Sequence, residues 1–565
     1  FYSFSALQLD VLLYSFHLFA LFKQYFASFA VINVLLFHQD AESEAIWPNL
    51  KEDFIIMLYP NSHTPHLQKE LFESPTSEYR STPFWAWNGK LNPERLSEQI
   101  HFFKKMGFGG FHMHVRTGMD SPYLTEEFMG YIRHCIDEAK DNQMLAWLYD
   151  EDRWPSGTAG GRVTAGKPEH ARKSLLFTTT PYPEESLRKS QEPEAGRGQD
   201  NIRQENGVLL AIYDVTLNPD GTLKDFAFAE EKAPLPSGAV RWYAYMEYAS
   251  ADPWFNNQAY SDTLNPEAID EFIELTHEAY YKSVGSSFGR TVPAIFTDEP
   301  QFTPKQPLNF AAEQTDIFLP WTRALPEIYE ETYHENLLEH LPELFWELPE
   351  GKLSAVRWRF ENLVTDLFVK TYCRKIGDWC REHNLYLTGH VMGEGSLSDQ
   401  TQAVGDAMRC YRAFVLPGID MLCDFHEYTT AKQTASIVHQ NGAEGMLSEL
   451  YGVTGWDYDF RGYKLQGDWQ AALGVTVRVP HLAWMTMKGE AKRDYPASIS
   501  YQSPWAEEFS MIEDHFARLN TALTRGKPVV RVAVVHPIES YWLAWGPQDQ
   551  TALLREEMGR QFKGQ

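Results

Sequence analysis

AIFTDEPQF, at residues 294–302, is the stretch that decides the fold. A short uncharged run ends abruptly at Asp298 and Glu299, and Pro300 prevents the strand from continuing. Such a run is typical of a strand buried on both faces, as in a parallel sheet. Two carboxylates therefore stand at the tip of a buried strand, either as a capping turn or as functional groups.

From residue 83 onward, short apolar runs alternate with amphipathic stretches, a pattern typical of a parallel α/β sheet. Two predicted helices open with Asn-Pro-Glu, with Asn92 and Asn265 as the capping residues. No Gly-rich phosphate turn follows the first strand, which argues against a doubly wound fold. We therefore predict an α/β fold of the (β/α)8 TIM-barrel type over about residues 80–525, with strands at 83–89, 109–115, 144–152, 294–300, 385–394, 418–424, 445–452 and 479–484.

Two insertions interrupt the barrel, at about residues 153–260 and 302–353. The first is expected to be a partly β subdomain with a hairpin around Asn218-Pro219-Asp220-Gly221. KPVVRVAVVHP, at 527–537, predicts the first strand of a further C-terminal α/β domain, so 526–565 is expected to be the truncated start of that domain.

The first 56 residues are expected to be a non-native or disordered extension. The apolar stretch at 11–37 carries Lys23 and Gln24 in mid-span and lacks a basic leader, so it is a poor signal peptide and no membrane partner is expected. Translation is expected to start near Met57, which makes 57–525 the catalytic domain.

The amino-acid composition limits the classes of molecule that the protein is expected to bind. Lys and Arg number 50 against 77 Asp and Glu, a net charge of −27, so phosphate backbones are repelled and no nucleic acid partner is expected. The five cysteines, an odd number without a CxxC pair, indicate reduced core thiols in a cytoplasmic protein. Aromatic residues make up 14% of the chain and suit both a core and the walls of a sugar site.

In such a barrel the active site lies at the carboxyl ends of the strands. Many of the predicted strand ends carry an ionisable or polar group, a crowding that a purely structural barrel does not need. The residues at or near these ends are Asn88, His112, His114, Asp150, Glu151, Asp152, Asp298, Glu299, Glu394, Asp424, Glu449 and Trp484.

Glu299 and Glu449 lie on the fourth and seventh strands, across the mouth from one another. Two facing carboxyls are the minimum equipment for cleaving a glycosidic bond, although surface acids at two loop starts would show the same pattern. Residues suited to binding a polyhydroxylated ring surround the pair, and each Trp among them also fits a core: Trp85, Trp87, Arg116, Arg153, Trp154, Trp456, Asp457, Asp459 and Arg461.

His112 and His114 suggest a different site. Alternate residues of a strand point the same way, so the two imidazoles could share a metal, joined by His390 and His426, as in barrel hydrolases of the amidohydrolase type. That family's pair belongs on the first strand rather than the second, and no lysine ends the fourth strand here.

Several motifs together resemble bacterial glycoside hydrolases of the α-L-rhamnosidase type, family 106, over about residues 71–545. These motifs are TPFWAWNGKLNPERL, GGFHMHVRTGM, WLYDEDRWPSGTAGG, FTDEP, and the stretch 447–496 that begins LSELYGVTGWDYDFRGY. The resemblance implies an exo-acting, inverting hydrolase with a calcium ion at its site, whose ligands cannot be placed, and no organic cofactor.

Within that resemblance, Glu299 in FTDEP would be the acid and Glu449 in LSELYG the base. Glu394 and Glu427 would be relatives of other acidic site positions. From their own positions at the strand ends, Asp298 is expected to orient substrate or neighbouring groups, and His390 is expected to contact substrate. Characterised members are often much longer and secreted, whereas this chain has no clean signal peptide and stops early. We therefore expect an intracellular enzyme that acts on imported oligosaccharides, alone or as a homo-oligomer. The same strand placement also occurs in retaining barrel glycosidases such as β-galactosidases, which stay as the alternative.

Overall fold

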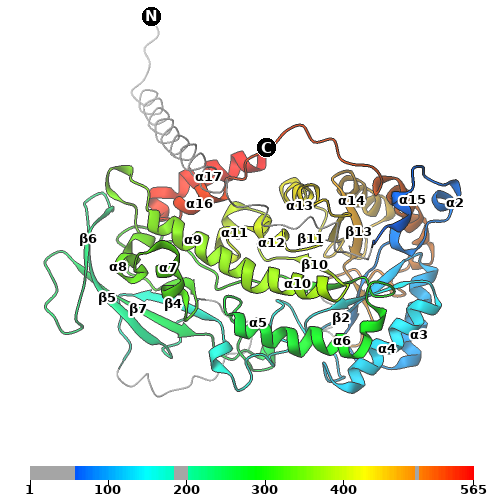
Figure 1. Cartoon of the computed structure of the whole chain (residues 1–565), viewed down its shortest axis with the longest axis horizontal. Coiled ribbons are helices and arrows are strands. Elements are labelled where there is room, and N and C mark those ends of the chain that lie inside the picture. Colours follow the sequence, from blue (N-terminus) through cyan, green and yellow to red (C-terminus); the bar gives the residue numbers. More distant parts are fainter. Residues whose placement is uncertain (1–56, 184–200, 490–494, 565) are drawn as a thin grey trace, which may run out of the picture. The chain divides into compact units, whose positions relative to one another are not determined.

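The computed structural model describes residues 57–183, 201–489 and 495–564 (Figure 1). The predictions for residues 1–56 lie outside the described residues. Among the helices within these ranges, none combines the length and the apolar character that a membrane crossing requires.

Eight parallel strands form a closed barrel, as the sequence predicts. They are β1 (Phe84–Trp87), β2 (Gly110–Val115), β3 (Leu145–Tyr149), β8 (Ala294–Asp298), β10 (Tyr386–His390), β11 (Leu416–Met421), β12 (Met446–Leu450) and β13 (Val475–Pro480). The segment of β13 continues into β14 (Ala483–Trp484), which pairs with β1. One stretch of chain thus bonds to β12 on one side and to β1 on the other, which closes the sheet.

Helices follow most strands: α3 (Pro93–Lys105), α4 (Glu126–Asp141), α5 (Pro266–Phe272), α6 (Glu278–Val284), α9 (Ala355–Phe368), α10 (Lys375–Glu382), α12 (Ala407–Tyr411), α13 (Tyr428–Asn441), α14 (Phe460–Ala472) and α15 (Ser510–Leu523). The two predicted caps are confirmed. Asn92 accepts from the Arg95 N–H at 3.0 Å, and Asn265 accepts from the Glu267 N–H at 3.0 Å.

The inserted subdomain is an antiparallel sheet in the order β6-β5-β7-β4-β9. Its strands are β4 (Lys173–Thr178), β5 (Val208–Leu217), β6 (Leu223–Phe228), β7 (Val240–Tyr248) and β9 (Ile317–Trp321). The β5–β6 hairpin around residues 218–221 is confirmed. The subdomain extends beyond residue 260, because β9 comes from the second insertion. Pro320 argues against a strand when the sequence alone is considered. The sheet accepts this proline because β9 lies at its edge.

The strand expected at 527–537 is not formed in the described structure. A strand needs a neighbour to accept its backbone hydrogen bonds, and this segment pairs with none of the described strands. Its valines are exposed, with Val529 at 80%. The chain then forms α16 (Ile538–Leu543) and α17 (Gln548–Gly564), which pack with Leu397 of α11 (Leu397–Ala403) in one apolar cluster.

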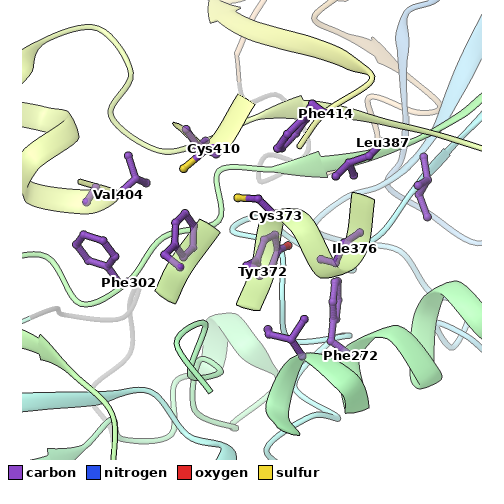
Figure 2. Packing of buried hydrophobic residues seen from close by; sticks show 14 of the residues in the cluster. Phe272, Phe302, Tyr372, Cys373, Ile376, Leu387, Val404, Cys410 and Phe414 are labelled. Atoms are coloured by element: carbon purple, nitrogen blue, oxygen red, sulfur yellow. The ribbon is translucent and has the colours of Figure 1, made fainter. Parts of the chain in front are cut away.

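The core lies both inside the barrel and between the sheet and its helices. Phe84, Trp147 and Phe296 belong to the interior cluster, whereas alternate residues of the same strands pack outward. Figure 2 shows the outer layer, where Tyr372 and Ile376 gather with Leu387 of β10. All five cysteines lie in the described ranges and none forms a disulfide; four of them are buried.

A buried ion pair ties the barrel to α15. Arg478 of β13 lies 3.1 Å from Glu513, with side-chain exposures of 2% and 0%. Glu513 also accepts from the Ser81 N–H at 3.1 Å, just before β1. The pair therefore joins the two strands that meet where the barrel closes.

We predict that Arg478→Ala lowers the free energy of unfolding by about 3–5 kcal/mol, because it leaves the Glu513 charge buried without its partner. Denaturant unfolding measures the loss. The matched control is Lys69→Ala, which breaks the exposed Lys69–Glu73 pair and should cost about 0.5 kcal/mol or less. Equal stability of the two variants would contradict this assignment.

Candidate active site

The alternation of each barrel strand decides which residues face the mouth. Inward positions on β8 run Ala294, Phe296, Asp298, and on β12 they run Leu447, Glu449. On six strands, the last residue that faces the barrel interior is polar or titratable. These residues are His114, Tyr149, Asp298, His390, Asp420 and Glu449.

His390 stands between two of these acids. Its Nε2 lies 3.3 Å from Asp298 Oδ1, and its Nδ1 lies 3.8 Å from Glu449 Oε2. Burial opposes protonation of the ring, but the hydrogen bond to Asp298 and the charges of Glu449 and Asp420 raise the pKa of His390 well above its ordinary value. These neighbours therefore favour the imidazolium form of His390.

Asp298 is held as its charged partner. The Tyr149 hydroxyl donates to Asp298 Oδ2 at 2.6 Å. Burial acts to raise the pKa of Asp298, yet His390 and the hydrogen bonds lower it below its ordinary value. These contacts therefore favour the ionised form of Asp298.

The two predicted catalytic glutamates approach this pair. Glu449 is buried and lies 3.3 Å from His481 Nε2 through its Oε1. Burial, then the charges of Asp420, Asp298 and Glu299, raise the pKa of Glu449 well above its ordinary value, against the effect of His390. Glu299 is half-buried, and it has a left-handed backbone (φ 48°) that is uncommon for a non-glycine residue.

Glu394 belongs to the same group of acids. It accepts from the Tyr411 hydroxyl and, at 2.7 Å, from the Asp420 N–H. Burial raises the pKa of Glu394 to about 7, although His390 opposes the shift. The structure thus brings four predicted site residues together: Asp298, Glu299, His390 and Glu449, with Glu394 beside them.

Sequence reasoning missed Asp420 and His481. It placed the sixth strand at 418–424 and took Asp424 as its end, whereas β11 ends at Met421 and Asp424 is exposed. The alternation of side chains along the strand indicates that Asp420 faces inward, because its neighbours Ile419 and Met421 are apolar and pack outward in one cluster.

Trp85 and Trp87 lie away from the mouth. Both are fully buried on the outward face of β1. Trp85 donates from Nε1 to Gln99 of α3 at 2.7 Å, and Trp87 packs edge-on against Phe128 of α4 at 5.8 Å. We therefore assign them to the core rather than to a sugar platform.

The histidine pair of β2 faces the barrel interior. His112 Nδ1 lies 3.1 Å from the Thr82 carbonyl, and His114 stacks on Tyr149 at 4.0 Å. Burial lowers the pKa of each to about 3. Among the described residues, neither joins a group of three metal-type ligands, and His426 is exposed beside Trp469. The amidohydrolase-type interpretation gains no support from this arrangement.

Three further predicted residues organise the loops of the rim. Asn88 exchanges hydrogen bonds with the Thr486 backbone at 2.8 and 3.1 Å. Asp150 accepts from the Ser156 hydroxyl at 2.6 Å. Glu151 is fully buried and accepts the N–H groups of Asp152, Gly157, Thr158, Ala159 and Gly160 at 2.6–3.0 Å.

Arginine and aromatic side chains meet on one side of the rim. The Arg116 guanidinium lies 4.4 Å from the Trp154 ring and 5.2 Å from the Tyr495 ring. Arg153 pairs with Asp152 at 2.8 Å. These cation–π contacts hold Arg116 and Trp154 as one wall.

The last predicted contacts lie after β12. Trp456 is 39% exposed and packs at 5.9 Å against Trp484, so it keeps a free face. Asp459 instead caps α14 by accepting from the Arg461 and Gly462 N–H groups. Its side chain also pairs with Arg461, which is 92% exposed, so both residues serve a surface helix end.

The acids around His390 do not fit the calcium ion that the resemblance implies. Within the part of the chain that the structure describes, two groups of three place their ligand atoms within 4.8 Å of one another: Asp298, His390, Glu449 and Glu299, His390, Asp420. Calcium prefers six to eight oxygen ligands, and each group includes an imidazole. Moreover, His390 reaches Asp298 and Glu449 through opposite nitrogens, so the ring itself fills the space between them.

A comparison with solved structures supports the barrel fold through a rhamnosidase. The chain is similar to a rhamnosidase from Novosphingobium sp. PP1Y, at 15% identity and TM-score 0.56 over 82% of this chain and 61% of that one. It also matches a polyextremophilic β-galactosidase from the Antarctic haloarchaeon Halorubrum lacusprofundi, at 12% identity and TM-score 0.40 over 81% and 62%. The chain spans about three fifths of the length of each. No family model matches it, and no curated protein matches it.

We predict that Glu151→Gln loosens the loop at 152–161, because an amide cannot accept five N–H groups as a carboxylate does. Hydrogen exchange of the amides of residues 157–160 should accelerate at least tenfold. Glu169→Gln, an exposed site in the same insertion, is the control. Unchanged protection in the Glu151 variant would mean that its carboxylate is free for substrate.

Proposed function

We propose that this chain is a glycoside hydrolase that removes a terminal sugar from an oligosaccharide, with Glu299 and Glu449 as the reacting carboxyls. The observation that carries the proposal is the group of acids on the inward strand ends, set around one imidazolium. Carboxyls that differ in protonation state are what glycosidic cleavage requires. The likeness to the rhamnosidase structure supports the barrel fold and not the sugar.

Within this proposal one glutamate protonates the leaving oxygen, and the other activates water or attacks the sugar carbon. The resemblance in sequence gives Glu299 the acid position and Glu449 the base position. Glu449 lies deep between His390 and His481, whereas Glu299 is the more open of the two. The open position suits an acid that meets a leaving group on the solvent side.

The side chains around the open end of the barrel suit the binding of a terminal sugar ring. Arg116 and Trp154 form one wall, and Trp456 offers an exposed face. Aromatic faces and charged hydrogen-bonding groups are the contacts that polyhydroxylated rings use. We favour an α-L-rhamnoside, on the sequence resemblance, with a retaining β-galactoside hydrolase as the alternative.

We predict that the protein releases nitrophenol from α-L-rhamnoside, and that Glu299→Gln and Glu449→Gln each lower kcat at least 100-fold, as expected for loss of a general acid or base. A panel of nitrophenyl glycosides measures this. Glu274→Gln, on the exposed Lys282 pair, is the matched control.

Two further readings sharpen the test. NMR of the first-formed sugar anomer separates inversion from retention. Activity in the presence of a chelator tests the calcium that the resemblance implies: because the acids around His390 do not fit that ion, loss of activity would indicate an ion bound elsewhere. Silence of the wild-type protein across the panel would contradict the proposal.

A further inference from the structure

Asp420 has no assigned part in the reaction proposed above, yet it adjoins two of its acids. It is the last inward residue of β11, and it pairs in register with Glu449 of the neighbouring β12. Its backbone N–H donates to Glu394 Oε1 at 2.7 Å. The strand that carries Asp420 therefore fixes its place beside both glutamates.

The side chain of Asp420 faces the centre of the mouth. Carboxyl oxygens of Asp420 and Glu299 and one ring nitrogen of His390 lie within 4.8 Å of one another. Asp420 Oδ1 is buried and accepts no hydrogen bond from any described residue. A carboxylate oxygen left in this state costs free energy, which a barrel that needed only packing would avoid with an apolar residue.

We propose that Asp420 is a positioning residue for glycoside hydrolysis: its carboxylate, beside His390 and in register with Glu449, holds the His390 ring at the centre of the acids. This inference rests on the proposed function of the site. The groups that face Glu449 from the surrounding strands and their ends are Asp298, Glu299, His390, Asp420 and His481.

The sign of the effect follows from these charges. Burial raises the pKa of Asp420 to about 6, so above that pH its carboxylate is a negative neighbour that disfavours the carboxylate of Glu449 and favours the imidazolium of His390. Asp420→Asn removes one negative charge and keeps the shape. Glu449 should then ionise at lower pH, and His390 should lose its proton at lower pH.

The first test is the pH dependence of kcat/KM. If Glu449 must be ionised to act, the acidic limb of the profile should move to lower pH by about one unit in Asp420→Asn. Asp420→Glu should restore the wild-type limb. Asp424→Asn, an equal charge change at an exposed site four residues along, should leave the limb in place. A lower rate at every pH without a shifted limb would overturn the proposal.

A second readout does not depend on activity. In protein labelled with ¹⁵N-histidine, the His390 ring signal is assigned by its loss in His390→Gln. The ring should stay protonated to a higher pH in the wild type than in Asp420→Asn. Identical titration in both folded proteins would overturn the proposal even if no glycoside is cleaved. A shifted titration in a protein that cleaves no glycoside would support the charge coupling and contradict the hydrolase function instead.

Discussion

The two-residue alternation of the parallel strands is the constraint on which the site depends. On each strand the same parity that sends Phe84 or Phe296 into the apolar barrel interior carries a polar residue to the mouth. A slip of one residue would exchange the two faces. On β11, for example, it would turn Ile419 and Met421 inward and remove Asp420 from the acids.

The imidazolium of His390 offsets the charge repulsion among these neighbouring acids. His390 bonds to Asp298 at 3.3 Å, and Tyr149 supports the same carboxylate at 2.6 Å, so one acid stays ionised at little cost. Glu449 and Glu394 have raised pKa values because they are buried and because negative neighbours surround them. The pKa values of neighbouring carboxyls are thus shifted in opposite directions, which is the condition for acid–base chemistry at one centre.

The barrel could be predicted because buried strands and capped helices leave local marks, such as AIFTDEP and the Asn-Pro-Glu openings. The acids of β8 and β12 could be predicted because they end apolar runs. Asp420 could not, because the predicted strand runs to Asp424, three residues beyond the end of β11 at Met421, so Asp420 does not stand at its end. Trp85 and Trp87 are predicted sugar contacts that the alternation of β1 instead turns toward α3 and α4. The 527–537 segment is the opposite case. Its composition predicts a strand, but composition alone does not supply a neighbouring strand to pair with.

The central claim is that the inward strand ends form one glycoside-cleaving centre. The most direct measurement is a crystal structure of Glu449→Gln soaked with the aryl glycoside that the wild-type protein cleaves fastest. The account predicts a sugar ring beside His390, with its glycosidic oxygen within hydrogen-bonding distance of the Glu299 carboxyl and its anomeric carbon facing residue 449. A ring bound on the outer face of the barrel, or a mouth that excludes the ligand at saturating concentration, would contradict it.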